Sequence, residues 1–388
     1  MTWPRLPLVF TILIACGPNP LCAQREIVVP APAASIPSGM VQVVLPNALC
    51  AAVSDTQSIL VMGHKALNNQ HLTVYKLDPN GKVSASPTRI ALPRADSLKE
   101  YDHYPLALAF HPTLPLLYVW QDINERDVGV TNEVPVFKDF NHLIVYAVKD
   151  GALQLAESHA RGPEFSYRNP LGSIGFSPDA KRLFLPNVRA LTPESGYDAS
   201  VGYFRLNANG MPIKEDSAAA RPVMVTPMMS YPIGTGFASG SSDTVMFGCY
   251  NGPSTWDLEN RRGQVSWCMF RDVNTPCLLT GHPKLPFVYT STLGAYFVHR
   301  MEHVDGYLTM LPHRIQVDGA AFQSAPVFMT KPNKLAVGSV NAIYLLSLET
   351  DGRFSKTVEM GVLTEPVVRG LVYSEKFDRL YVAVGEAK

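Results

Sequence analysis

Short apolar runs, in several of which apolar residues alternate with polar or small ones, recur along most of the chain and predict β-strands. The runs fall into similar units, and each unit begins with a proline. Proline suits the first position of a strand, because it has no N–H group to give to a neighbouring strand. The seven prolines are Pro46, Pro105, Pro170, Pro232, Pro276, Pro326 and Pro366. Their recurrence indicates an internal repeat.

Each unit has the same internal order of strand, turn, strand, loop and strand. The first strand is rich in small residues, as in LGSIGF at 171–176, and the second in aromatic and aliphatic ones, as in LPLLYVW at 114–120. The third strand, as in HLIVYAV at 142–148, precedes an Asn-Gly or Asp-Gly pair, a strong hairpin signal because both residues need positive φ. These pairs are Asn80-Gly81, Asp150-Gly151, Asn209-Gly210, Asp305-Gly306 and Asp351-Gly352.

The unit length of about 40 to 65 residues brackets one four-stranded propeller blade with its insertions. The sequence therefore predicts an all-β fold, a β-propeller of seven blades with three to four antiparallel strands each; six or eight blades are the alternatives. The last unit, 366–388, has room for two strands, so we expect residues 26–45 to complete its blade and close the ring. The fourth unit is expected to lack an outer strand, because only RDVNT separates its third strand, QVSWCMF at 264–270, from Pro276.

The repeat resembles the YVTN and lactonase type of seven-bladed β-propeller. The matching stretches are FHPTLPLLY at 110–118, FSPDAKRLF at 176–184, HPKLPFVY at 282–289 and DRLYVAV at 378–384, with VYKLD and VYAVKDG in third strands. The resemblance covers most of residues 45–388. It implies architecture more than chemistry, because the motifs do not specify a substrate.

The amino end has the pattern of an export signal, with Arg5 followed by the apolar run LPLVFTILIA. Two cleavage sites compete: one before Gln24, which makes residues 1–23 the signal, and a lipobox that makes residues 1–15 the signal and Cys16 a lipidated first residue. Residues 24–44 would then be a tether with closing strands, and 45–388 the propeller domain. We expect a periplasmic or extracellular protein, membrane-anchored only through a lipidated Cys16, and no transmembrane segment in the mature chain, because the apolar runs are too short.

The charge and the cysteines limit the partners and cofactors. The 33 basic and 33 acidic residues give a net charge of zero, which argues against nucleic acid. Cys249 and Cys268 could face one another across a hairpin as a disulfide, whereas Cys50 and Cys277 fall on separate inner strands as buried thiols. No cysteine pair has metal-ligand spacing and no cofactor motif occurs, so we predict no metal and no cofactor. We also expect a monomer.

In a propeller, the loops before each first strand and between the second and third strands emerge on one face, around the channel mouth. Here those loops concentrate aromatic, acidic and arginine residues, which suit a polar small molecule or carbohydrate through stacking and bidentate hydrogen bonds. The alternative is that they are only solvated loop residues. The expected ligand-binding residues are Tyr101, Tyr104, Tyr167, Tyr231, Tyr250, Trp256, Arg261 and Arg262.

Lactone chemistry, which the resemblance suggests, needs a group that moves a proton and arginines that hold an anion and a developing oxyanion. The candidates near the mouth are His103 and Glu365 for proton transfer, and Arg168 and Arg369 for the anion. Arg369 is a charge within an inner strand, where other units mainly place small or apolar residues. An ion pair with a neighbour is the alternative role for it.

Other chemistry has little support in the sequence. His111 and His282 both precede a proline at the same position of the repeat, so we assign them to the fold rather than to a metal. No G-x-S-x-G, H-E-x-x-H, P-loop or C-x-x-C-H motif occurs.

Two hypotheses for function follow. The first is an exported propeller scaffold that binds a small polar ligand or an envelope protein at the mouth. The second is a lactonase-like hydrolase acting on a sugar-acid lactone at the same mouth. An enzyme requires the proton-transfer group and the arginines to converge, whereas a binding protein needs only an exposed aromatic face.

Overall fold

The structure is a computed structural model of the 388-residue chain. It describes residues 25–34, 39–44, 48–64, 71–93, 102–124, 140–161, 174–190, 197–213, 234–237, 244–249, 252–257, 262–265, 277–292, 294, 296–304, 307–363 and 367–385. The regular secondary structure within these ranges consists of β-strands alone, so the described chain is all-β, as predicted.

Seven small sheets make up the described structure, one for each proline-headed unit. In the first four sheets all neighbouring strands pair antiparallel. Their strands are β3 (Ala48–Ser54), β4 (Ile59–His64), β5 (His71–Lys76) and β6 (Thr88–Ala91) in the first; β7 (Asp102–Phe110), β8 (Leu116–Asn124), β9 (Phe140–Lys149) and β10 (Ala152–Arg161) in the second; β11 (Gly175–Phe176), β12 (Arg182–Ala190) and β13 (Tyr197–Arg205) in the third; and β14 (Gly234–Phe237), β15 (Thr244–Cys249), β16 (Gly252–Asp257) and β17 (Arg262–Val265) in the fourth.

The remaining three sheets include both ends of the described chain. Their strands are β18 (Cys277–Gly281), β19 (Phe287–Thr292), β20 (Phe297–Val304), β21 (Tyr307–Val317) and β1 (Arg25–Val29) in the fifth; β22 (Val327–Met329), β23 (Lys334–Gly338), β24 (Ala342–Leu348) and β25 (Phe354–Val362) in the sixth; and β26 (Val367–Ser374), β27 (Arg379–Gly385) and β2 (Met40–Val44) in the seventh.

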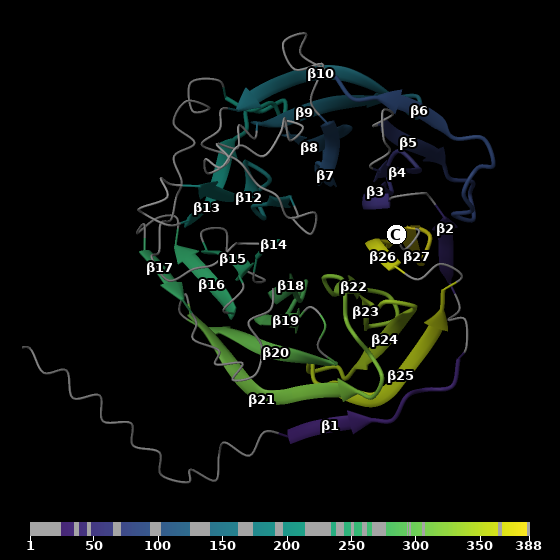
Figure 1. Cartoon of the computed structure of the whole chain (residues 1–388), viewed down its shortest axis with the longest axis vertical. Coiled ribbons are helices and arrows are strands. Elements are labelled where there is room, and N and C mark those ends of the chain that lie inside the picture. Colours follow the sequence, from purple (N-terminus) through teal and green to yellow (C-terminus); the bar gives the residue numbers. More distant parts are fainter. Residues whose placement is uncertain are drawn as a thin grey trace, which may run out of the picture.

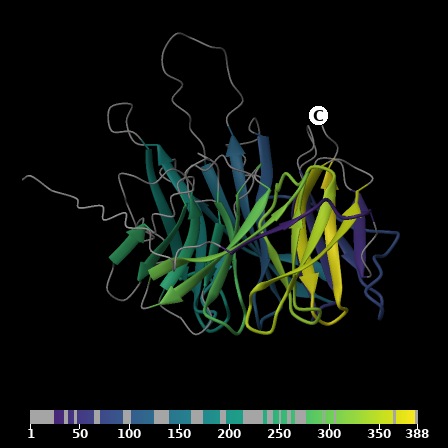
Figure 2. The same ribbon diagram turned by 90° about the horizontal axis from the view of Figure 1, so that it is seen from below.

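The sheets stand around a common centre, with the first strand of each sheet innermost (Figure 1). Strand β3 contacts β26 on one side and β7 on the other, so the seventh, first and second sheets are neighbours. Seen from the side, the strands run between two faces (Figure 2). We call the mouth face the one at which second strands such as β27 end and their antiparallel first strands, such as β26, begin.

The N-terminal strands pair with strands from the C-terminal part of the chain, as predicted, but they join two different sheets and not one. MVQVV forms β2 and pairs with β27, whereas EIVV lies in β1 and pairs with β21 of the fifth sheet, and both pairs are parallel. Between them Ala34 bridges to Met360 of the sixth sheet. The segment expected as a tether therefore contributes backbone pairs to the outer edges of three successive sheets.

The fourth sheet corrects a second expectation, because its outer strand is present. Its third strand is β16, GPSTWD, which contains Trp256, a residue expected above in a loop at the mouth, and β17 pairs with it as the fourth. A proline and two small residues gave this strand a weak hydrophobic pattern, so the more apolar QVSWCMF was assigned instead.

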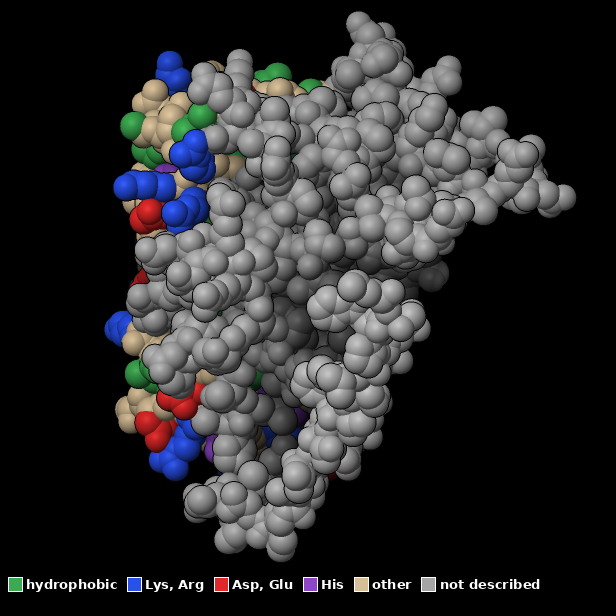
Figure 3. Space-filling model, turned by 90° about the vertical axis from the view of Figure 1, so that its left-hand side faces the viewer, with side chains coloured by type: hydrophobic (Ala, Val, Ile, Leu, Met, Phe, Trp, Pro, Cys, Tyr) green, Lys and Arg blue, Asp and Glu red, His purple; other side chains and the backbone are tan. Residues whose placement is uncertain are grey.

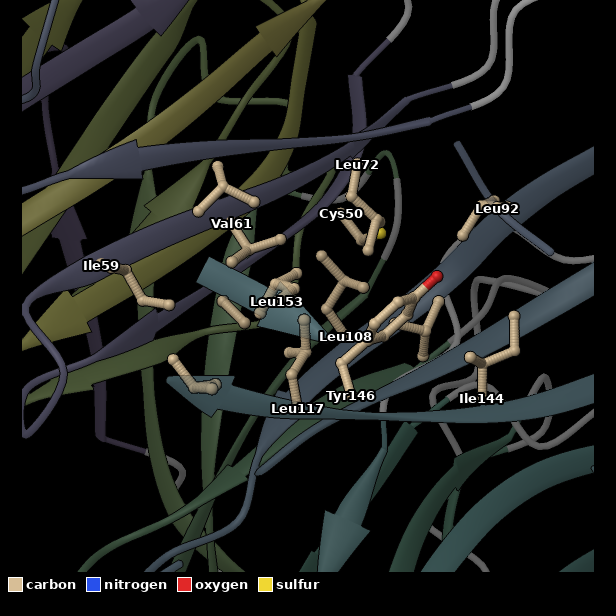
Figure 4. Close-up of a cluster of buried hydrophobic side chains, with 14 residues drawn as sticks. Cys50, Ile59, Val61, Leu72, Leu92, Leu108, Leu117, Ile144, Tyr146 and Leu153 are labelled. Carbon is tan, nitrogen blue, oxygen red and sulfur yellow. The ribbon is translucent and has the colours of Figure 1, made fainter. Parts of the chain in front are cut away.

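The core lies between neighbouring sheets. Between the first and second, side chains of both sheets point toward one another, including Val61 and Leu72 from one and Leu108, Leu117 and Tyr146 from the other (Figure 4). Full burial of one such aliphatic side chain stabilises a fold by roughly 1.5 to 3 kcal/mol.

Hydrogen bonds from tyrosines link sheets at the face opposite the mouth. The hydroxyl of Tyr289 donates to the carbonyl of Gly352 in the next sheet at 2.8 Å, and that of Tyr381 donates to Gly81 at 2.7 Å. Tyr118 donates likewise to Gly210. Each acceptor is the glycine of an Asn-Gly or Asp-Gly turn and has a φ near 75°, as at Gly210 (77°). The tyrosine of the repeat motif is therefore a structural residue.

Candidate functional site

The candidate site lies at the mouth face of the seventh, first and second sheets. Their inner strands β26, β3 and β7 each contain a register shift near that face, at Arg369, Leu49 and Leu106. Bulges bend a strand and re-aim its side chains, and they are common next to active sites. Arg369 therefore occupies the bulge position that carries leucine in the two neighbouring inner strands.

Close backbone packing holds these three strands together. A Cβ atom on Gly370 would lie 3.0 Å from the amide nitrogen of Ala51, and one on Gly63 would lie 2.5 Å from Cγ of Pro105. The absence of side chains at both positions lets β26 and β7 approach the first sheet. Any larger residue would force the strands apart.

Cys50 lies between these strands as a buried thiol, as predicted. Its Sγ donates to the carbonyl of Pro105 at 3.7 Å. Burial raises the pKa of this thiol to about 12, so it stays protonated at neutral pH and is a poor nucleophile.

Two buried histidines form the polar feature that the sequence analysis missed. His64 ends β4, His71 begins β5, and the two residues lie directly opposite one another. Their Nε2 atoms are 2.6 Å apart, and Oγ1 of Thr73 is 3.5 Å from Nε2 of His64. Burial, the charge of His71 and that of Arg89 lower the pKa of His64 to about 4. The sequence did contain a signal for this pair: one histidine stands at each end of the loop that joins β4 and β5, and these two strands pair with one another.

Among the catalytic candidates, the structure describes the backbones of His103 and Arg369. His103 lies in β7 opposite Ile123, and Arg369 lies at the bulge of β26. Their strands contact β3 from its two sides, so both residues lie at the mouth end of sheets that are separated by the first sheet. Glu365 and Arg168 lie outside the described residues.

The ligand-binding candidates fall into three groups. Tyr104 lies in β7 opposite Asp122, at the mouth. Trp256 in β16 pairs with Val245, and Arg262 begins β17, so both lie toward the opposite face and away from Tyr104. Tyr101, Tyr167, Tyr231, Tyr250 and Arg261 lie outside the described residues.

The disulfide prediction is untested. Cys249 ends β15, and Cys268 lies outside the described residues.

His111 and His282 cap turns in the fold. Nδ1 of His111 accepts the backbone N–H groups of Thr113 and Leu114, at 3.2 and 3.1 Å. Nδ1 of His282 accepts the equivalent pair, both at 3.0 Å. Serine hydroxyls act at the same position of other sheets, as Ser54 does for Gln57. The repetition of these histidines therefore reflects turn capping.

Two further observations concern the surface and the described elements. In the view of Figure 3, described acidic and basic side chains lie interspersed along one edge of the molecule, in line with the zero net charge. Within the described ranges, no helix has the length and hydropathy needed to cross a membrane.

The chain is similar to several solved structures. A protein from Lactobacillus plantarum matches with a TM-score of 0.56 at 14% identity, over 83% of this chain and 86% of that one. A "putative 6-phosphogluconolactonase" from Bacteroides fragilis matches with a TM-score of 0.55 at 11% identity, over 86% of this chain and 89% of that one. Another of that name, from Bacteroides uniformis, matches with a TM-score of 0.54 at 12% identity, over 81% of this chain and 84% of that one.

No protein-family model matches the sequence. No curated protein matches it either. The structural likenesses and the ring of small sheets show that the chain has a lactonase-like β-propeller fold. At 11 to 14% identity, they show the fold alone.

Proposed function

We propose that this chain is an exported, seven-bladed β-propeller that binds a small, anionic, polar ligand at its mouth face. The seven sheets of the described chain support the blade number. The observation that carries the ligand site is the bulge at Arg369, on an inner strand whose neighbours carry leucine at the same position. A guanidinium suits a carboxylate or phosphate because it donates two parallel hydrogen bonds.

The second candidate is hydrolysis of a sugar-acid lactone at the same place. Two of the similar structures carry the name 6-phosphogluconolactonase, which supports lactones as the first compounds to test. In that reaction Arg369 would hold the acid or phosphate group, and His103 would transfer a proton during attack of water on the ester carbonyl.

Ligand binding is tested with matched arginine variants of the chain that begins at Gln24. Arg369→Leu installs the residue found at the neighbouring bulges, and Arg262→Leu makes the same change toward the opposite face. The ligands are sugar-acid lactones with and without phosphate, and the corresponding free acids. We expect the Arg369 variant to bind the best ligand at least about tenfold more weakly, since a hydrogen bond to a charged group is worth roughly 1.5 to 3 kcal/mol.

The Arg262 variant should bind like the wild type. Equal weakening in both variants, or none in the Arg369 variant, would refute the mouth site. Turnover of a lactone that falls about 100-fold or more in His103→Ala would establish the hydrolase. If a ligand binds but no lactone is hydrolysed, the result supports the binding protein and not the hydrolase.

Export is tested by the mass of the mature protein from a bacterial host. A chain beginning at Gln24 supports a soluble exported protein, and a diacylated chain beginning at Cys16 supports a lipoprotein. An intact amino terminus in the cytoplasm would refute export.

A further inference from the structure

The histidine pair at the end of the β4–β5 ladder has a geometry suited to more than structural packing. The two imidazole rings are nearly perpendicular, with centroids 3.8 Å apart, and their Nε2 atoms face one another at 2.6 Å. His64 is 5% exposed and His71 is 4% exposed. Ring nitrogens of two buried side chains thus converge on one point.

We propose that His64 and His71 form a binding site for a divalent transition metal ion of the zinc, nickel or copper class. Imidazole nitrogen is a preferred ligand of these ions, whereas calcium and magnesium prefer oxygen. The proposal is independent of the ligand site at Arg369.

A metal binds a neutral imidazole ring through a nitrogen lone pair. An ion at this pair would therefore take the place of the hydrogen between the two Nε2 atoms.

The distance between the two rings requires a small movement. Two nitrogens bound to one tetrahedral zinc at about 2.0 to 2.1 Å lie about 3.3 Å apart, so the pair must open by about 0.7 Å. The pair forms the last rung of the β4–β5 ladder, where one strand ends and the other begins. Within the described ranges, Nδ1 of His64 has no hydrogen-bond partner, so a rotation of this ring breaks no bond to those residues on that side.

The rest of the coordination sphere would be open. Among the described residues, no three His, Cys, Asp or Glu side chains gather as a metal site, and the nearby oxygen is Oγ1 of Thr73. Water or a ligand oxygen would therefore fill the remaining positions. No described residue accepts a hydrogen bond from Nδ1 of His64. Loss of such a partner typically weakens a site about 10- to 100-fold, so we expect micromolar rather than nanomolar binding.

The test uses the untagged chain that begins at Gln24, stripped with a chelator and titrated with zinc or nickel chloride in a calorimeter. We expect one ion per chain, and at least a tenfold loss of affinity in His64→Gln and in His71→Gln. His282→Ser is the matched control: it removes a buried histidine at a position where other sheets carry serine, and it should leave the affinity unchanged.

Circular dichroism of each variant checks that it folds. X-ray absorption of the zinc-loaded wild type supplies a measurement that needs no variant, with two imidazole nitrogens expected at about 2.0 Å. The proposal is wrong if the wild type binds no ion below about 100 μM, if the spectrum shows no imidazole, or if the His282 variant loses binding as the pair variants do. Any of those results would leave the pair with a structural role, as a hydrogen bond between two buried imidazole rings.

Discussion

At the scale of single residues, burial of imidazoles makes stability depend on pH. The pKa of His64 is lowered from 6.5 to about 4 and that of His299 to about 3, in both cases mainly by burial. Between these values and 6.5 the unfolded chain binds more protons than the folded one, so stability rises with pH there. His71 and Arg89 add positive charge beside His64.

We therefore expect the contribution of these neutral histidines to the free energy of unfolding to be fully present above pH 6.5. The free energy of unfolding should then fall as the pH drops toward 4. The contribution of His64 is on the order of 1 to 3 kcal/mol. Urea titrations at a series of pH values measure it, and His64→Gln should flatten the curve in that window while leaving the part due to His299. An unchanged slope in this variant would contradict the assignment.

At the scale of elements, β1 and β2 contribute differently although both pair in parallel with a strand from the other end of the chain. Strand β1 adds a fifth strand to a complete sheet and packs Ile27 and Val29 on the core. Strand β2 is one of only three described strands in its sheet and covers the edge of β27.

Truncation separates the two strands. A chain beginning at Gly39 lacks β1 and the Ala34 bridge but keeps β2. It should unfold several degrees below the chain that begins at Gln24, since burial of two aliphatic side chains is worth roughly 3 to 6 kcal/mol at most. A chain beginning at Pro46 also lacks β2 and should self-associate through the bare edge of β27. Size-exclusion chromatography and thermal unfolding measure both. Monomeric behaviour and equal stability of the shorter chain would show that β2 does not close the ring.

At the scale of the whole molecule, bonds between the last and first sheets join residues about 300 positions apart. Asp55 accepts the hydroxyl of Ser374 and the backbone N–H of Lys376, and Tyr381 donates to Gly81. These bonds join the seventh sheet to the first, so they can form only when the sheets from both ends of the chain have folded next to one another.

Paired tyrosine variants test this closure. Tyr381→Phe leaves the Gly81 carbonyl without its donor and should lower the free energy of unfolding by about 1 to 3 kcal/mol. Tyr146→Phe makes the same change at a similarly buried hydroxyl that has no hydrogen-bond partner in the part of the chain that the structure describes, and should be neutral or stabilising. Denaturant unfolding measures both, and equal losses would show that the bond to Gly81 contributes nothing particular.

The sequence by itself determined the parts of this protein that depend on neighbours along the chain. The small-residue first strands, the LYV-type second strands and the Asn-Gly or Asp-Gly turns each follow from local φ preference and strand periodicity, and together they predicted seven units and an all-β fold. In the described turns of this kind the glycine has positive φ as expected, but the residue before it does so only at Asp150, so the expectation of two positive φ values was wrong at the others. The weak pattern of β16 marks where this local signal failed.

Tertiary structure alone decided which strands pair across the ring and which side chains meet. The partner of β1, the bulge at Arg369 and the convergence of His64 on His71 depend on contacts between segments or on strand register, and register shifts leave no local signature. For the same reason Trp256 and Arg262 were grouped with the mouth residues, although their strands lie toward the opposite face. A repeat fixes the order of strands along the chain, whereas the face that a residue reaches depends on where each strand begins and ends in the folded ring.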